Sequence, residues 1–281
     1  MRSDEIRLIF IQDLDSALKS ESKSIAIGLE YCSRFISEKK RVLEALELII
    51  NNQKQPVLVT PSVCATEFNL IKSVVLGALA KYPDLQIVFN DFGLLRTITN
   101  SFKHNQLSTW WAGRLISRGM SDWPWFETIL RSEREDVYNG FLSSSTNHPE
   151  IVSLLKMMGI GGVEINNTRL NEKNCQQIKE YGFKTKIHIG PKLLAVSRSC
   201  IELRDKVNSG RSPFCNGTCT KKFELKLHSL ESSSVPLDSK DKIQGTYPEL
   251  MVVGAGIFEK NFNSLLQISR DYVDETSMTI F

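Results

Sequence analysis

Residues 55–89, QPVLVTPSVCATEFNLIKSVVLGALAKYPDLQIVF, contain the pattern that decides the fold. The stretch opens with the apolar run Gln55–Thr60, continues through a helical pattern over Glu67–Lys81, and closes with the nearly all-apolar run Leu85–Phe89. Short runs of this kind, rich in Val and Ile, are typical of strands buried on both faces of a parallel sheet. A helix between two such strands predicts a βαβ unit.

The same alternation extends to both sides of this unit. Further strands are expected at Ser24–Leu29, Leu107–Trp111, Gly162–Ile165, Lys184–Ile189, Phe223–Leu227 and Leu250–Val253. Further helices are expected at Ser37–Asn51, from Gly93 to Phe102, and at Pro149–Met158, Leu170–Tyr181 and Asn261–Tyr272. About eight strands alternating with helices in a chain of this length predict an α/β fold, a (β/α)₈ TIM-type barrel of regular or irregular form.

Composition and charge narrow the class of protein. The chain of 281 residues is 41% hydrophobic and 24% charged, which is ordinary for a globular protein. Its net charge of +3 is too small to indicate a nucleic-acid partner. The start, MRSDEIRLIFIQDLD, lacks the features of a secretory signal, and no apolar run is long enough to span a bilayer. We therefore expect a cytoplasmic protein whose thiols stay reduced.

Three cysteines lie in one late polar segment. Cys215 and Cys219 flank a turn-favouring Asn-Gly pair, and Cys200 lies upstream. In a reducing compartment such a loop favours a soft metal bound by thiolates, and both structural zinc and iron–sulfur clusters take four cysteines. Cys175 lies in a helical pattern and is expected to be a buried core residue. The fourth ligand is then Cys32 or Cys64, and the spacing of the residues does not distinguish between these two.

Several motifs, spread over most of the chain, resemble one known family. They are Glu30-Tyr31-Cys32-Ser33-Arg34, Asn90-Asp91-Phe92-Gly93, Gly113-Arg114-Leu115-Ile116, Val163-Glu164-Ile165-Asn166, and Arg198-Ser199-Cys200 followed by Cys215-x₃-Cys219. Together they resemble the collagenase-like peptidase superfamily, in its UbiU/UbiV branch and most closely the UbiV side. Ser197 and Phe92 stand where that branch usually has glycine and tryptophan, so the chain would be a divergent member.

The resemblance implies a cofactor and a partner. It implies a [4Fe–4S] cluster held by Cys32, Cys200, Cys215 and Cys219, within a single barrel domain over 1–281. The metal-binding loop would span about 197–222, and an insertion is expected at about 113–146. It further implies a role in oxygen-independent hydroxylation of an aromatic or quinone precursor in ubiquinone biosynthesis, in a heterodimer with a UbiU-like partner.

Four further residues are candidates for the substrate pocket, because chemistry in barrels lies where strands end. Asp91 would pair with Arg114 or cap the following helix. Glu164 would line the pocket or form a structural salt bridge. His188 would be an acid or base, or a hydrogen-bonded core residue. Two alternatives of another class stay open: a collagenase-like peptidase, although no hydrolase motif occurs, and a non-catalytic barrel with a structural Cys₄ zinc.

Overall fold

The computed structural model describes residues 3–8, 13–102, 110–123, 126, 134–197, 200, 223–225, 249–259 and 266–280. Within these residues, parallel strands close into a barrel in the order β1-β12-β7-β6-β5-β4-β3-β2. The strands are β1 (Glu5–Leu8), β2 (Ser24–Ile27), β3 (Gln55–Val59), β4 (Gln86–Phe89), β5 (Trp110–Ala112), β6 (Gly162–Asn166), β7 (Lys184–Ile189) and β12 (Glu275–Ile280). The predicted (β/α)₈ TIM-type fold is therefore confirmed.

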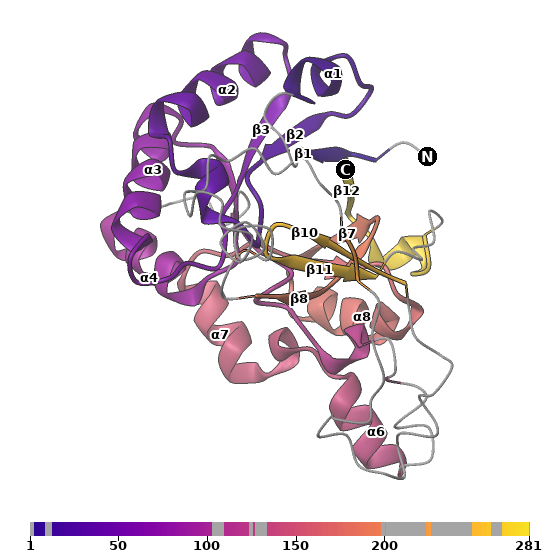
Figure 1. The fold of residues 1–281 in the computed structure, drawn as a ribbon. Coiled ribbons are helices and arrows are strands. Elements are labelled where there is room, and N and C mark those ends of the chain that lie inside the picture. Colours follow the sequence, from indigo (N-terminus) through magenta and orange to yellow (C-terminus); the bar gives the residue numbers. More distant parts are fainter. Residues whose placement is uncertain are drawn as a thin grey trace, which may run out of the picture.

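Helices cover the outside of the barrel, and α2, α3 and α4 form an arc along one side (Figure 1). The α-helices are α1 (Leu14–Leu18), α2 (Lys39–Asn51), α3 (Phe68–Lys81), α4 (Phe92–Ser101), α6 (Glu135–Leu142), α7 (Pro149–Met157) and α8 (Glu172–Glu180). Short 3₁₀ helices are η2 (Ser33–Ile36), η3 (Met120–Asp122), η4 (Ser145–Asn147), η5 (Arg169–Asn171) and η7 (Arg270–Tyr272). The main core lies between helices and barrel: Leu46 of α2 and Val75 of α3 are fully buried in it beside Ile25 of β2. No helix among the described residues is long and apolar enough to cross a membrane.

A second, antiparallel sheet lies across the barrel, where Figure 1 shows β8, β10 and β11 side by side. Its order is β8-β11-β10-β9, formed by β8 (Lys192–Val196), β9 (Phe223–Leu225), β10 (Leu250–Val253) and β11 (Gly256–Glu259). A small apolar cluster joins this sheet to the segment that follows β2: Leu29, Tyr31, Leu193, Met251, Val253 and Phe258. We call these residues the mouth cluster, because they lie beyond the carboxyl end of β2.

The structure differs from the prediction for two strands and one helix near the end of the chain. Residues 223–225 and 250–253 form strands, but in the second sheet rather than in the barrel. The barrel is closed instead by β12, which lies between β1 and β7. The predicted closing helix Asn261–Tyr272 is not observed in residues 266–272, where a 3₁₀ turn spans Arg270–Tyr272, and 260–265 lie outside the described residues. The apolar spacing in this segment serves loop packing instead, since Ile268 is buried in the main core.

Candidate functional site

The barrel interior has two unlike halves. Side chains at alternate positions of β2 to β5 form an apolar cluster: Ala26, Val57, Val59, Val88 and Trp111. The facing strands β1, β6, β7 and β12 place polar and charged side chains inside: Glu5, Arg7, Glu164, Lys186, His188, Ser277 and Thr279. We call these the apolar half and the charged half. Trp111 joins them, because the Lys186 ammonium lies 4.4 Å from its ring centroid.

The charged half begins near the amino ends of the strands. Lys186 Nζ pairs with Glu275 Oε2 at 3.2 Å and with Glu5 Oε2 at 2.7 Å. Glu5 Oε1 in turn accepts from Arg7 Nη2 at 3.2 Å, and the same Arg7 nitrogen donates to Glu164 Oε1 at 2.5 Å. Glu5, Arg7, Glu164 and Lys186 are fully buried. Such charges are tolerated inside a protein only when they are paired.

The chain of ion pairs continues to the carboxyl end of the barrel. Arg7 Nη1 donates to Glu30 Oε1 at 3.0 Å, and Arg114 Nε donates to the same oxygen at 2.9 Å. Arg114 Nη1 also donates to Asn166 Oδ1 at 3.0 Å. Glu30 follows β2, Arg114 follows β5, and Asn166 ends β6, so these side chains lie at the end where barrel enzymes carry their chemistry. One connected network therefore runs from the start of β12 to the mouth.

The carboxyl groups of this network have unlike proton affinities. Burial opposes the charge of Glu30, but attraction to Arg114 and Arg7 outweighs burial and lowers the Glu30 pKa to about 2. Burial raises the pKa of Glu164 above its ordinary value, and Arg7 and Lys186 offset that effect only in part. Glu164 Oε2 and Arg7 Nε are buried without a hydrogen-bond partner among the described residues. Of the three fully buried carboxyl groups Glu5, Glu30 and Glu164, Glu164 is thus the one whose pKa is raised.

His188 lies in the same interior and is held neutral. Burial lowers its pKa well below the ordinary value, and the positive charges of Arg114, Arg7 and Lys186 act in the same direction. Its ring nitrogens are both satisfied, with Nδ1 2.7 Å from Ser277 Oγ and Nε2 2.8 Å from Thr279 Oγ1. In this structure His188 is therefore a buried side chain with a hydrogen-bond partner at each ring nitrogen.

The structure brings three of the four predicted pocket residues into one region and leaves the fourth outside. Arg114 and Glu164 belong to the ion-pair network, and His188 lies beside it. Asp91 instead caps α4: the Leu94 N–H donates to Asp91 Oδ1 at 2.8 Å. Pairing of Asp91 with Arg114 is not observed, because Arg114 is engaged by Glu30 and Asn166.

Sequence reasoning missed the groups that connect these residues. Glu5, Arg7 and Lys186 were not predicted, and neither was the strand β1 that carries the first two. The available signal was the alternation Glu5-Ile6-Arg7-Leu8, in which every second residue is charged. Such alternation usually indicates a strand with one face exposed to solvent. Here, however, β1 is buried on both faces.

The described cysteines differ in their surroundings. Cys32 is partly buried and packs against the mouth cluster, and Cys200 is also partly buried. Cys64 is exposed, whereas Cys175 is buried in α8, where burial raises the thiol pKa to about 12. Cys215 and Cys219 lie outside the described residues. Within the described part of the chain, no three His, Cys, Asp or Glu side chains gather as a metal site, so the ligand set stays a prediction.

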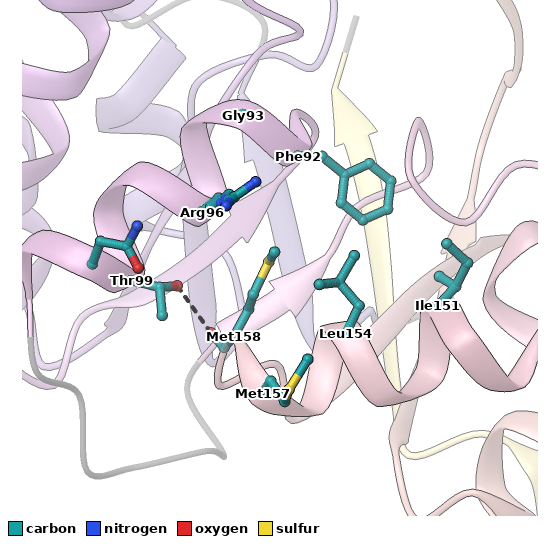
Figure 2. Close-up of a pocket in the computed structure, with 9 residues that line it drawn as sticks. Phe92, Gly93, Arg96, Thr99, Ile151, Leu154, Met157 and Met158 are labelled. Carbon is teal, nitrogen blue, oxygen red and sulfur yellow. Dashed lines mark hydrogen bonds between the residues drawn. The ribbon is translucent and has the colours of Figure 1, made fainter.

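An open groove of about 640 Å³ lies between α4 and α7. Figure 2 shows Phe92 of α4 facing Leu154 and Ile151 of α7, with Arg96 at the side. Thr99 Oγ1 donates to the Met158 carbonyl at 3.2 Å across its end. The lining is mainly apolar and contains neither thiol nor carboxylate, so the groove offers contact surface rather than acid–base chemistry.

The fold and the interior network define the class of this molecule: an α/β barrel with a mouth covered on one side by a second sheet. No family model and no curated protein matches the chain. Its fold is similar to that of the U32 peptidase Mk0906, with a TM-score of 0.49 and 10% identity over 100% of this chain and 93% of that one. It is also similar to a phosphodiesterase from Oleispira antarctica, solved with the product sn-glycerol-3-phosphate, with a TM-score of 0.42 and 12% identity over 74% of this chain and 90% of that one.

Proposed function

We propose that this chain is a divergent member of the collagenase-like peptidase superfamily, of the UbiV type, that carries a [4Fe–4S] cluster. Cys32, Cys200, Cys215 and Cys219 would hold the cluster at the carboxyl end of the barrel. The chain would act with a UbiU-like partner in oxygen-independent hydroxylation of an aromatic or quinone precursor. The motifs around Cys32 and Cys200 support the assignment, and the placement of these two cysteines carries it.

Cys32 and the segment that leads to Cys200 both lie at the mouth cluster. Cys32 packs against this cluster after β2, and Val196, at the end of β8, packs against it from the second sheet. Cys200 follows Val196 by four residues, so its Cα lies within about 14 Å of the Val196 Cα. Two cysteines that are 168 residues apart in sequence (200 minus 32) thus belong to segments that meet at one end of the barrel.

The chemistry of the donors fits the group. Iron–sulfur clusters require thiolates, and Cys32 and Cys200 both keep partial access to solvent. Cys175 is a poor ligand, since its thiol stays protonated and faces the core. When bound, the cluster would supply electron transfer. The chain's own contribution is the turn that carries Cys32: the Cys32 N–H donates to the Leu29 carbonyl, and Cys32 packs against the mouth cluster.

Anaerobic purification followed by a visible spectrum and iron, sulfide and zinc analysis tests the proposal. We expect a brown protein with a broad band near about 400 nm and about four irons with matching sulfide. A colourless protein that contains one zinc would refute the redox function and favour the structural Cys₄ site.

Single substitutions test the ligand set. Replacing Cys32, Cys200, Cys215 or Cys219 by Ala is expected to abolish iron binding, because a four-thiolate site loses a ligand. Cys64→Ala and Cys175→Ala are the controls and are expected to keep the full iron content. Loss of iron in Cys64→Ala would show that the ligand set is wrong.

A further inference from the structure

We propose that Glu30 is a positioning residue, which fixes the direction of the Cys32 thiol because Arg7 and Arg114 hold its carboxylate inside the barrel. The inference deepens the proposed function, but only the identity of the metal rests on that function. The position of the Cys32 turn is a property of the polypeptide itself.

The hold on Glu30 comes from two sides of the barrel. Arg7 reaches it from β1, and Arg114 reaches it from the segment after β5, with three nitrogen–oxygen distances of 3.0, 2.9 and 2.5 Å to the same oxygen. The Glu30 side chain is 1% exposed. Three charge-assisted hydrogen bonds to one buried carboxylate oxygen leave the Glu30 side chain little conformational freedom. The backbone of Glu30 is therefore anchored to the barrel interior.

The backbone carries this anchoring to Cys32. The Ser62 N–H donates to the Glu30 carbonyl at 3.0 Å, which ties the segment to the chain beyond β3. The Cys32 N–H donates to the Leu29 carbonyl at 3.5 Å, and these two residues form a β-bridge. Cys32 is extended, and the 3₁₀ helix η2 begins at the next residue. Glu30 therefore sits inside the turn that presents the Cys32 thiol.

The neighbouring Tyr31 is held from the opposite direction by the second sheet. Its ring meets Phe258 edge-on at 5.3 Å between centroids, and it lies against Gly254 and Gly256 of the β10–β11 hairpin. A Cβ on Gly256 would lie 2.7 Å from Phe258 and 3.0 Å from Tyr31. The sheet can therefore approach this closely only over glycine. Residues 30 and 31 are thus held by barrel and sheet respectively, and Cys32 follows both.

The structure supplies a matched control at Glu5. Glu5 is as buried as Glu30 and also accepts a hydrogen bond from Arg7, but it lies on β1 and is linked to the Cys32 turn only indirectly, through Arg7. Glu30→Gln and Glu5→Gln therefore remove the same charge from the same arginine at equal burial. A general weakening of the barrel would affect both variants alike, whereas loss of positioning would affect only the first.

The experiment has two readouts on anaerobically purified full-length protein. The first is the rate at which a chelator bleaches the iron chromophore, and the second is the alkylation rate of Cys32 by iodoacetamide in metal-free protein, followed by peptide mass spectrometry. We expect both rates to rise about tenfold in Glu30→Gln relative to Glu5→Gln, at the lower end of the 10–100-fold range by which groups that orient metal ligands change metal affinity. Equal rates in the two variants would overturn the proposal.

The positioning role can still be tested if Glu30→Gln does not fold or if the wild-type protein contains no iron. If Glu30→Gln does not fold, Arg114→Lys replaces it, because this variant keeps the charge but loses the fork that holds Glu30; it is expected to raise the same rates. If the wild-type protein contains no iron, the proposed function fails, and the alkylation rate alone decides the positioning role. An unchanged alkylation rate in both Glu30→Gln and Arg114→Lys would refute that role whatever the metal.

Discussion

The two halves of the barrel interior are built on different principles. β2 to β5 fill their half with Val57, Val59 and other apolar side chains, which interact through shape and volume. β1, β6, β7 and β12 fill the other with charged and polar groups, of which Arg7 alone contacts three carboxylates. An apolar neighbour can be replaced by another of similar size, but a buried charge depends on each of its partners. The charged half should therefore be the less tolerant of substitution.

The largest contrast is expected between Arg7→Met and Val59→Ala. Arg7→Met leaves Glu5, Glu30 and Glu164 without a shared cation and should lower the free energy of unfolding by about 3–5 kcal/mol. Val59→Ala removes only buried methyl groups and should cost about 2 kcal/mol. Urea denaturation at pH 7 measures both. If the two losses are equal, the halves do not differ in the way described.

A smaller effect, specific to the charged half, concerns pH and His188. Its pKa lies well below the ordinary 6.5 in the folded chain, so the unfolded chain binds more protons as pH falls through 6.5. Stability should then decrease by about 1.4 kcal/mol per pH unit below that value from this group alone. His188→Gln, which can still hydrogen-bond Ser277 and Thr279, should flatten the slope between pH 6.5 and 5.5.

Glu30 affects stability in a lower pH range. Because its pKa is lowered to about 2, its contribution to the free energy of unfolding is lost only as the pH falls from about 4 towards 2.

The smallest effect is expected for Glu164→Gln. Burial already favours the protonated form of this carboxyl group, and a glutamine oxygen can accept from Arg7 in its place. The variant should change the free energy of unfolding by about 1 kcal/mol or less, well below the loss in Arg7→Met. A loss of comparable size to Arg7→Met would mean that Glu164 is held as firmly as Glu30.

The same contrast bears on two strands that the sequence did not reveal, β1 and β12, although β6 and β7 of the charged half were predicted from the apolar residues between their polar ones. β3 and β4 carry apolar residues at almost every position, so their runs at Val57–Val59 and Ile87–Phe89 were recognised directly. β1 and β12 were missed because their inward positions are charged or hydroxylated, as at Glu5, Arg7 and Ser277. Only the partners on other strands make such residues fit a barrel interior, and those partners are distant in sequence.

For the candidate site, the sequence identified individual residues but not their connections. Glu164 and Arg114 were named because they follow or lie in expected strands, and the structure joins them through Arg7 and Glu30. Asp91 was named for the same reason, yet its place at the start of α4 makes it a helix cap. Which polar residue after a strand turns inward depends on the closure of the barrel, which no local pattern encodes.

The pairing of β1 with β12 has a consequence for how the chain folds. Asp4 and Thr276, which hydrogen-bond beside this pair, are 272 residues apart in sequence. During synthesis, one edge of β1 and one edge of β7 therefore stay unpaired until residues 275–280 have been made. Until then the charged groups of Arg7 and Lys186 remain exposed to water. Contacts of such long range form slowly, and open edges invite association with other chains. Barrel closure, rather than helix formation, should set the pace of folding and be the step at which a chaperone helps most.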